Sequence, residues 1–191
     1  MINKFKKIVI KIGSSSIIDE KTRKIKTKWL NSICKDIEVL NNENRKIAIV
    51  SSGAIALGTK FITSNKSLRK LEDKQAAAAI GQIELANCWQ QALKKNKIYS
   101  AQLLLTLNDS EIRRRYLNVR KTISSLHKNK IVPIINENDT VATEEIRYGD
   151  NDRLAARVAQ MIDADLLIML SDVDGLYLES PLKNKQAKKI I

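Results

Sequence analysis

Residues 5–16 read FKKIVIKIGSSS, and this stretch indicates the fold class of the chain. Its β-branched run stops at Gly13 and a serine triplet, the pattern of a buried strand followed by a donor-rich loop. Apolar runs of the same kind recur along the chain, at 46–50, 98–105, 131–135 and 166–170. Helix-like segments separate these runs. We therefore expect an α/β fold, with a mostly parallel sheet sandwiched by helices.

The segments between the expected strands carry apolar residues at helical spacing. The expected stripes are Leu30, Ile33, Ile37 and Leu40, then Ile112, Tyr116, Val119, Ile123 and Leu126, and then Leu154, Val158, Met161 and Ile162. An Ala-rich helix is expected from Asp73 to about Lys95. Asn108 and Asp109 are the expected caps of the second stripe. Residues 59–72 predict a polar surface loop, and 141–146 a short β-like piece.

The composition excludes several classes of protein. Of the 191 residues 43% are hydrophobic and only six are Gly and two Pro, which excludes a collagen, a disordered Pro/Gly tail and a disulfide scaffold. No apolar run approaches the roughly 18–20 residues of a membrane-spanning helix, so we expect no membrane partner. The first apolar run is broken by Lys11 and predicts a strand, not a signal peptide. Cys34 and Cys88 have no metal-ligand spacing, which favours a reduced, cytoplasmic protein.

The net charge is strongly positive but unevenly distributed. Thirty-four Lys and Arg stand against 21 Asp and Glu, which gives +13. Residues 1–136 carry 27 basic and 10 acidic side chains, whereas 137–179 carry 3 basic and 11 acidic ones. A Lys- and Ile-rich composition reflects genome bias as readily as function. Because aromatic residues are scarce and no nucleic-acid-binding motif is present, we expect no nucleic-acid partner.

Five polar clusters fall at the ends of the expected strands. They are Lys11 with Gly13-Ser14-Ser15, Ser51-Ser52-Gly53, Asn136 to Asp139, Gly149 to Asp152, and Ser171-Asp172. Ligands of such folds bind at the carboxyl ends of the strands, so we expect these clusters to form one site. Small residues expose N–H groups to phosphate oxygens, a lysine neutralises charge, and carboxylates organise Mg²⁺ or lysine ammonium groups. The set favours phosphoryl transfer.

Each cluster also has a plainer interpretation. The first could be only a turn, the second a helix cap, and the fourth a pair of acids favoured by a helix dipole. Neither a P-loop nor a G-x-G-x-x-G fingerprint is present. His127, the sole histidine, is expected in a solvated position near a helix end, and Arg113 to Arg115 on a solvated face. The functional interpretation depends on all five clusters falling at strand ends in order.

The motifs VIKIGSSS, IVSSGAIALG, AAIGQ, NENDTVATEEIRYGDNDRLAA and LSDVDGLY closely resemble those of the glutamate 5-kinases (γ-glutamyl kinases) of the amino acid kinase superfamily. The resemblance runs from Lys11 to about residue 186. K-x-G-S-S and S-D-x-x-G-L-Y are shared across the superfamily and specify the fold. The combination of SSGAIA, INENDxVAT and GDND is more specific and points to the glutamate enzymes. The whole chain, 1–191, would then be one amino acid kinase domain.

The resemblance implies ATP-dependent phosphorylation of the L-glutamate side-chain carboxylate to L-glutamyl 5-phosphate, the first step of proline biosynthesis. Its implied partners are L-glutamate and ATP with Mg²⁺, proline as a feedback inhibitor, and further copies of the chain in a homo-oligomer. The implied catalytic residues are Lys11, on the transferring phosphoryl group, and Asp152, which organises the catalytic lysines. The implied glutamate-binding residues are Ser52, Asp139 and Asn151, with Asp150 close by. The implied nucleotide-binding residues are Lys11, Gly13, Ser14, Ser171 and Asp172.

The chemistry of this reaction agrees with those residue types. Nucleophile and electrophile are both anionic, so Lys11 and Mg²⁺ on the ATP phosphates would have to compensate their repulsion. No general base is needed, because the attacking carboxylate is already ionised at pH 7. Asp139 suits the α-ammonium group of the substrate, and hydroxyl and amide donors suit its carboxylates.

The chain also departs from the family pattern. Family members continue with a Gly-rich segment that ends in a second lysine, and many bacterial members add an RNA-binding-like domain. Residues 172–191 match neither, so we expect an incomplete nucleotide half and a poor or inactive kinase. The alternatives are a non-catalytic remnant that binds glutamate or proline, an accessory subunit of a complete kinase, or a kinase for another amino acid or a nucleotide.

Overall fold

The computed structural model of the protein describes residues 4–62, 70–141 and 150–171, together with 173, 175, 177–179, 181, 184 and 186–190. Of Asp150 it describes the backbone alone. Of the sequence predictions, Asp172 and residues 142–149 therefore lie outside the described residues.

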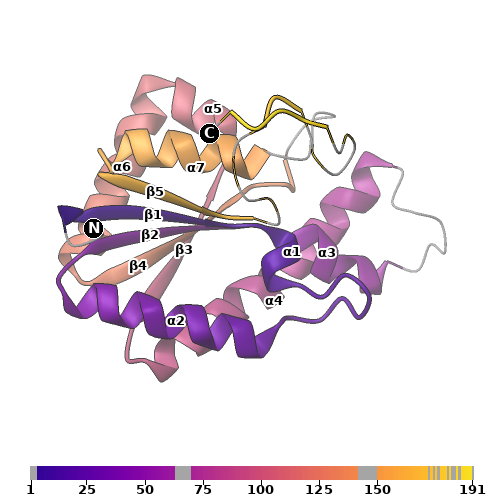
Figure 1. Ribbon diagram of the computed structural model, residues 1–191, viewed down its shortest axis with the longest axis horizontal. Coiled ribbons are helices and arrows are strands. Elements are labelled where there is room, and N and C mark those ends of the chain that lie inside the picture. Colours follow the sequence, from indigo (N-terminus) through magenta and orange to yellow (C-terminus); the bar gives the residue numbers. More distant parts are fainter. Residues whose placement is uncertain are drawn as a thin grey trace.

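Five parallel strands form the sheet of the described chain (Figure 1). They are β1 (Lys7–Ile12), β2 (Lys46–Ser51), β3 (Tyr99–Leu105), β4 (Ile131–Glu137) and β5 (Leu166–Leu170). Their order across the sheet is β3-β4-β2-β1-β5, and each neighbouring pair is parallel. All five strands were expected, and the predicted parallel α/β architecture is confirmed.

Helices cover both faces of this sheet (Figure 1). The helices on one side are α2 (Thr27–Asn42) and α4 (Leu71–Lys95), with the short α1 (Ser14–Ile17), α3 (Ala54–Gly58) and η2 (Thr59–Phe61) at one end. The helices on the other side are α6 (Arg113–Lys128) and α7 (Asp150–Met161), with α5 (Leu107–Glu111) beside them. Two hydrophobic clusters fill the spaces between the sheet and these two layers.

Strand β1 shows how the alternation of side chains places a charged group. Ile8, Ile10 and Ile12 belong to the core on the α2 and α4 side, and Val9 to the core on the α7 side. Successive side chains of a strand point to opposite faces, so Lys11 shares the face of Val9. Its ammonium group therefore extends toward the beginning of α7, at the carboxyl end of the sheet.

Two glycines bring α3 and α4 into backbone contact. A Cβ atom on Gly58 would lie 1.8 Å from the carbonyl oxygen of Ala77, and one on Gly81 would lie 1.8 Å from that of Ala54. Only glycine allows an approach this close. This contact holds α3, behind β2, against the middle of α4.

The helices after β3 correct one prediction. Asn108 and Asp109 do not cap the long helix; they lie inside α5, where Thr106 and Asp109 form a capping box. The Asp109 carboxylate accepts the backbone N–H of Thr106 at 2.7 Å and its hydroxyl at 2.8 Å. The chain then turns at Ile112, which is 47% exposed, and α6 begins at Arg113. The apolar spacing predicted one helix capped by Asn108 and Asp109, whereas the structure has two helices, α5 and α6, separated by a turn at Ile112.

Three smaller predictions also change. Strand β4 runs two residues further than expected, because Asn136 and Glu137 continue its pairing with β3. Strand β5 is not fully buried: it lies at the edge of the described sheet, and Met169 is 46% exposed. The expected loop at 59–72 begins as η2 and ends where α4 starts, with residues 63–69 outside the described part. Within the described part, no helix combines the length and apolar character needed to cross a membrane.

Candidate functional site

Polar side chains from four separate segments meet at the carboxyl end of the sheet. They come from β1, the residue behind β2, the end of β4 and the first turn of α7. Parallel strands end at the same edge, so residues far apart in the sequence become neighbours there. The side chains of Lys11, Ser52, Asn136 and Asn151 therefore gather at this edge.

Lys11 is the cation of this edge. It is 7% exposed, and its Nζ lies 2.5 Å from Oδ1 of Asp152 in α7. The Asp152 side chain is 45% exposed and that of Lys11 only 9%, so the pair meets solvent from the aspartate side. Removing a lysine ammonium from water is costly unless a carboxylate accompanies it. Asp152 therefore supplies the negative charge that accompanies the Lys11 ammonium group at this edge.

A run of amide and hydroxyl groups lies next to this ion pair. We name it the amide chain; its members are Gln82, Asn136, Asn151 and Ser52. Asn151 Nδ2 donates to Ser52 Oγ at 2.8 Å and to Asn136 Oδ1 at 3.1 Å. Asn136, only 2% exposed, donates in turn from Nδ2 to Gln82 Oε1 at 2.7 Å. Each amide thus orients the next, across β4, α4 and α7.

The amide chain leaves one acceptor and one donor unused. Oδ1 of Asn151 is buried and receives no hydrogen bond from the described residues. Ser52 Oγ already accepts from Asn151, and its own hydroxyl proton remains available to donate. A buried polar atom without a partner is rare in folded proteins and calls for an explanation. A ligand with one ammonium group and one carboxylate would satisfy both positions.

Gly13 and Ser14 lie beside Lys11, where the sequence placed them. The N–H of Gly13 donates to the carbonyl of Leu170 at 3.1 Å and is therefore not available to a phosphate. A Cβ atom on Gly13 would lie 3.5 Å from Lys11 Nζ. Gly13 therefore lies against the ammonium group, and its backbone N–H does not have the phosphate-binding role that the sequence suggested. Ser14 begins the four-residue α1.

The other predicted residues stand at the rim of this edge. Asp139 lies half-buried in the turn behind β4, three residues beyond Asn136. Ser171 directly follows β5 and is exposed. Asp150 is the first residue of α7, and its side chain lies outside the described part. The structure brings together Lys11, Asp152, Ser52 and Asn151.

Gln82 was not among the predicted site residues. The sequence interpretation used its motif, AAIGQ, only as part of a resemblance, because nothing local marks a helical glutamine as a hydrogen-bond acceptor. Its position seven residues before the buried Trp89 places it on the core-facing side of α4. Trp89 itself donates from its indole N–H to Ser51 Oγ at 2.9 Å, so α4 also anchors the end of β2.

The described residues contain no group of three or more His, Cys, Asp or Glu side chains that could hold a metal ion. The two cysteines do not change this. Burial raises the pKa of the Cys34 thiol to about 12 and also raises that of Cys88, so both stay protonated at neutral pH. Among the described residues of this edge, Lys11 and Asp152 form an ion pair and the amide chain supplies oriented amides.

Residues 6–191 match the model of the amino acid kinase family. The chain is 56% identical over 189 residues to glutamate 5-kinase 1 of Mesorhizobium japonicum, covering 99% of this chain and 50% of that protein. It is 54% identical to glutamate 5-kinase of Sinorhizobium fredii, covering 98% of this chain and 47% of the relative. The chain thus spans about half the length of the curated relatives it matches.

A solved structure shares the fold. UMP kinase from Bacillus anthracis superposes with a TM-score of 0.62 over 97% of this chain and 72% of that one. Their sequences are 15% identical, so this likeness concerns the fold alone. It agrees with the sheet and helix layers of Figure 1.

Proposed function

Because the chain belongs to the amino acid kinase family, we propose that it binds L-glutamate at the amide chain and serves the ATP-dependent phosphorylation of its side-chain carboxylate. The product would be L-glutamyl 5-phosphate, the first intermediate of proline biosynthesis. The observation that carries the proposal is the pair of unused groups on Asn151 and Ser52, next to the Lys11–Asp152 ion pair. The curated relatives named glutamate 5-kinase support the choice of substrate.

The two unused groups complement an amino acid. The Asn151 carbonyl would accept from the α-ammonium group, and the Ser52 hydroxyl would donate to a carboxylate. Asp139, at the rim, would add a negative charge toward the same ammonium group, and Asp150 would lie close by. Because Gln82 and Asn136 already fix the Asn151 amide, this geometry exists before the ligand arrives, which reduces the entropy lost on binding.

The transfer itself needs little beyond position and charge. A glutamate side-chain oxygen would attack the γ-phosphorus of ATP as the bond to the β,γ-bridging oxygen breaks, releasing ADP. No proton moves, because the attacking carboxylate is ionised. Lys11 would neutralise the charge that gathers on the transferring group, and Asp152 would hold that ammonium in place. ATP would enter as its Mg²⁺ complex, and Ser14, Ser171 and Asp172 would border the nucleotide.

One assay tests this function directly. The purified chain is mixed with ATP, Mg²⁺, L-glutamate and hydroxylamine, which traps an acyl phosphate as a hydroxamate. Turnover that disappears in Lys11→Ala would support catalysis. We expect calorimetric binding of L-glutamate that weakens about tenfold in Asn151→Ala. D-Glutamate and L-aspartate are the matched controls for the ligand.

The outcomes separate the alternatives. Glutamate binding without hydroxamate would support a glutamate-binding piece that needs further residues for transfer. Absence of both in a folded chain would contradict the proposal. Displacement of glutamate by proline and a mass above that of one chain would extend it to feedback inhibition and a homo-oligomer.

A further inference from the structure

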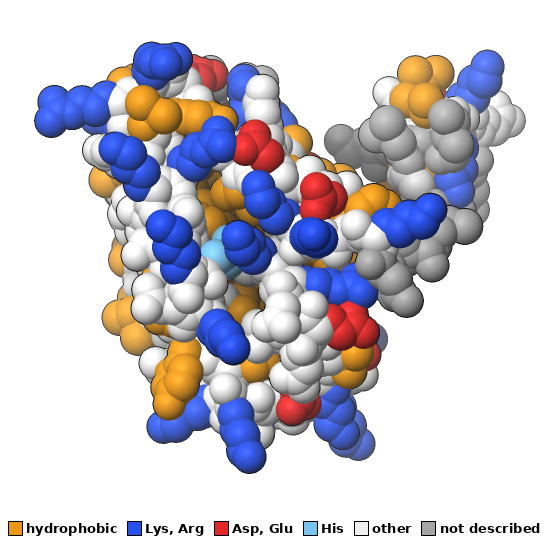
Figure 2. Space-filling view, turned by 90° about the vertical axis from the view of Figure 1, so that its left-hand side faces the viewer, with side chains coloured by type: hydrophobic (Ala, Val, Ile, Leu, Met, Phe, Trp, Pro, Cys, Tyr) orange, Lys and Arg blue, Asp and Glu red, His pale blue; other side chains and the backbone are white. Residues whose placement is uncertain are grey.

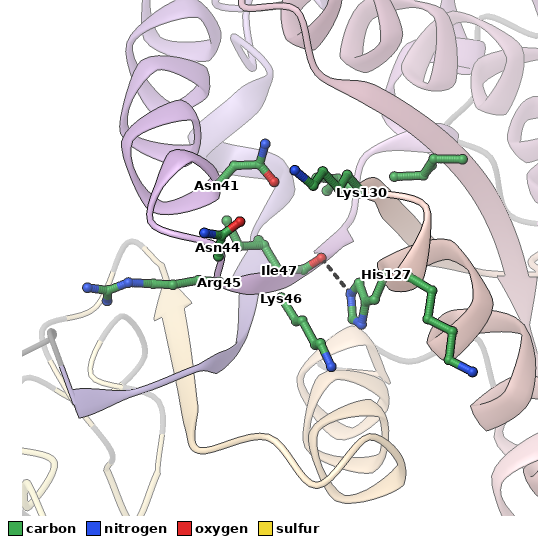
Figure 3. A pocket seen from close by; sticks show the side chains of 10 residues that line it. Asn41, Asn44, Arg45, Lys46, Ile47, His127 and Lys130 are labelled. Atoms are coloured by element: carbon green, nitrogen blue, oxygen red, sulfur yellow. Dashed lines mark hydrogen bonds between the residues drawn. The ribbon is translucent and has the colours of Figure 1, made fainter.

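The opposite end of the sheet, where the strands begin, carries a basic hollow of about 210 Å³ (Figure 2). We define it by its basic lining residues Arg45, Lys46, His127, Lys128 and Lys130, to which asparagines and aliphatic residues are added. The Arg45 side chain itself extends away from His127 and pairs with Glu43 (Figure 3). In Figure 2 the histidine lies between blue side chains, with Lys and Arg around the depression. Nothing in the proposed function uses this end of the molecule.

The fold builds the hollow from two turns of the same kind. Strands β2 and β4 are parallel neighbours, and each is entered from a helix, α2 or α6. Asn44 and Lys130 both take a left-handed conformation, with φ of 58°, to end the helix and start the strand. The two turns thus lie side by side at one edge, as the close view of Figure 3 shows. Ile47 and Val132 form an apolar floor between them.

The charge of the hollow is uncompensated within its own lining. Ten described residues line it, and none of them is Asp or Glu. Glu43 pairs with Arg45 at 2.5 Å, outside this lining, while Lys46, Lys128 and Lys130 are exposed. A helix dipole accounts for cations in a last helical turn, which applies to His127 and Lys128. It does not account for Lys46 and Lys130, which follow the helix ends.

His127 is held in a defined orientation inside this charge. Its Nε2 lies 3.0 Å from the carbonyl oxygen of Ile47 (Figure 3). A carbonyl can only accept, so Nε2 carries the proton and Nδ1 remains unprotonated in the neutral ring. Burial lowers the pKa of His127, the bond to Ile47 opposes this, and Lys46 and Lys7 lower the pKa further. The sequence had placed this residue in solvent; it is instead half-buried and anchored.

We propose that the basic hollow binds a small phosphate-bearing anion of pyrophosphate size. A hollow of about 210 Å³ has room for an anion of this size. An anion would relieve the mutual repulsion of Lys46, Lys128 and Lys130. Asn41 and Asn44 add amide groups at the rim (Figure 3). A nucleic-acid strand fits less well, because none of the ten lining residues is Phe, Trp or Tyr on which bases could stack.

The test is a titration of the 191-residue chain with inorganic pyrophosphate at constant ionic strength, followed by NMR. His127 is the sole histidine of the sequence, so its imidazole signals need no assignment by mutation. We expect these signals to shift saturably, and the affinity to fall about tenfold in the double variant Lys46→Ala/Lys130→Ala. The matched control, Lys28→Ala/Lys35→Ala, removes the same charge from exposed positions of α2 that do not line the hollow.

Other outcomes would overturn the inference. They are an unsaturable shift, an equal loss of affinity in both double variants, or tighter binding of a short RNA that pyrophosphate does not displace. Lys128→Ala/Lys130→Ala serves as a second variant should the first not fold. Lys11→Ala separates the two ends: it is expected to abolish hydroxamate formation in the assay above and to leave the His127 shift unchanged. Loss of that shift in Lys11→Ala would place the anion at the other end and contradict the inference.

Discussion

The two ends of the parallel sheet organise their polar groups in opposite ways. At the carboxyl end, Lys11 has Asp152, and the amide chain passes hydrogen bonds from Asn151 to Gln82. At the amino end, the basic hollow gathers like charges, and none of its described lining residues is acidic. At the carboxyl end, most polar groups already have partners without a ligand. At the amino end, the positive charges of the hollow are balanced only when an anion binds.

This difference has an energetic consequence. Buried groups that satisfy one another are costly to disturb, because removal of one partner leaves the other unsatisfied. Exposed like charges repel weakly in water and respond to salt, pH and anions. We therefore expect substitutions at the carboxyl end to change stability and binding together, and substitutions at the amino end to change the response to solution conditions.

The largest effect is expected from Gly81→Ala, which breaks the support of the carboxyl end. The new Cβ atom would lie 1.8 Å from the Ala54 carbonyl oxygen and force α3 and α4 apart. We expect a loss of about 3 kcal/mol in the free energy of unfolding, measured by urea denaturation. Gly13→Ala is the control, because its nearest neighbour is 3.5 Å away. An unchanged or raised stability of Gly81→Ala, as helix propensity alone predicts, would contradict the close contact.

A smaller loss is expected from Trp89→Phe. Trp89 is fully buried and its N–H bonds to Ser51, which is also fully buried. Phenylalanine keeps much of the ring but leaves Ser51 Oγ without its donor, at a cost of about 2 kcal/mol by urea denaturation. Ser51→Ala in the Trp89→Phe background should cost little more. Additive losses in the double variant would show that the hydrogen bond contributes nothing of its own.

Gln82→Leu tests whether the amide chain acts as a unit. It leaves Asn136 Nδ2 without an acceptor, so we expect about 1 kcal/mol of lost stability and weaker binding of L-glutamate by calorimetry. Gln90→Leu on the same helix is the control, because Gln90 is exposed. If Gln82→Leu and Gln90→Leu bind glutamate with equal affinity, the chain does not position Asn151.

The smallest effect is expected at the amino end, from pH. The pKa of His127 is lowered in the folded protein from its ordinary value of 6.5, so the unfolded chain binds the proton more readily. The contribution of His127 to the free energy of unfolding should therefore be fully present above pH 6.5 and decline as the pH falls below that value. Thermal unfolding from pH 7.5 to 5.5 measures this slope, and His127→Gln should flatten it.

Titration of Asp109 does not contribute to the change in stability between pH 7.5 and 5.5. Burial by itself would raise the pKa of Asp109, but the Thr106 hydrogen bonds and Arg115 lower it overall from its ordinary 3.8. Its contribution is lost only as the pH falls below that value. A slope between pH 7.5 and 5.5 that persists in His127→Gln would assign the effect to another group.

Much of the fold could be predicted because its signals are local. Each of the five strands, and each apolar stripe of α2 and α7, lies within a run of fewer than 20 residues, and the sequence predicted all of them. The capping box of Thr106 and Asp109 was missed although it is also local, because Asn108-Asp109 offered a competing cap. For the candidate site, the sequence places Lys11 and Ser52 at the ends of β1 and β2, and the structure places Asn151 in the first turn of α7, where it contacts Ser52.

The sequence by itself determined the alternation of strands and helices, the parallel sheet and the edge at which its polar residues collect. Only the tertiary structure decided which of those residues touch. The order β3-β4-β2-β1-β5 places Asn136 against Gln82 and Asn151, and the packing of α7 on β1 pairs Lys11 with Asp152. The basic hollow likewise exists because β2 and β4 are neighbours. Periodicity records which face a residue takes, whereas contacts between distant segments depend on strand order and helix packing, which no single segment encodes.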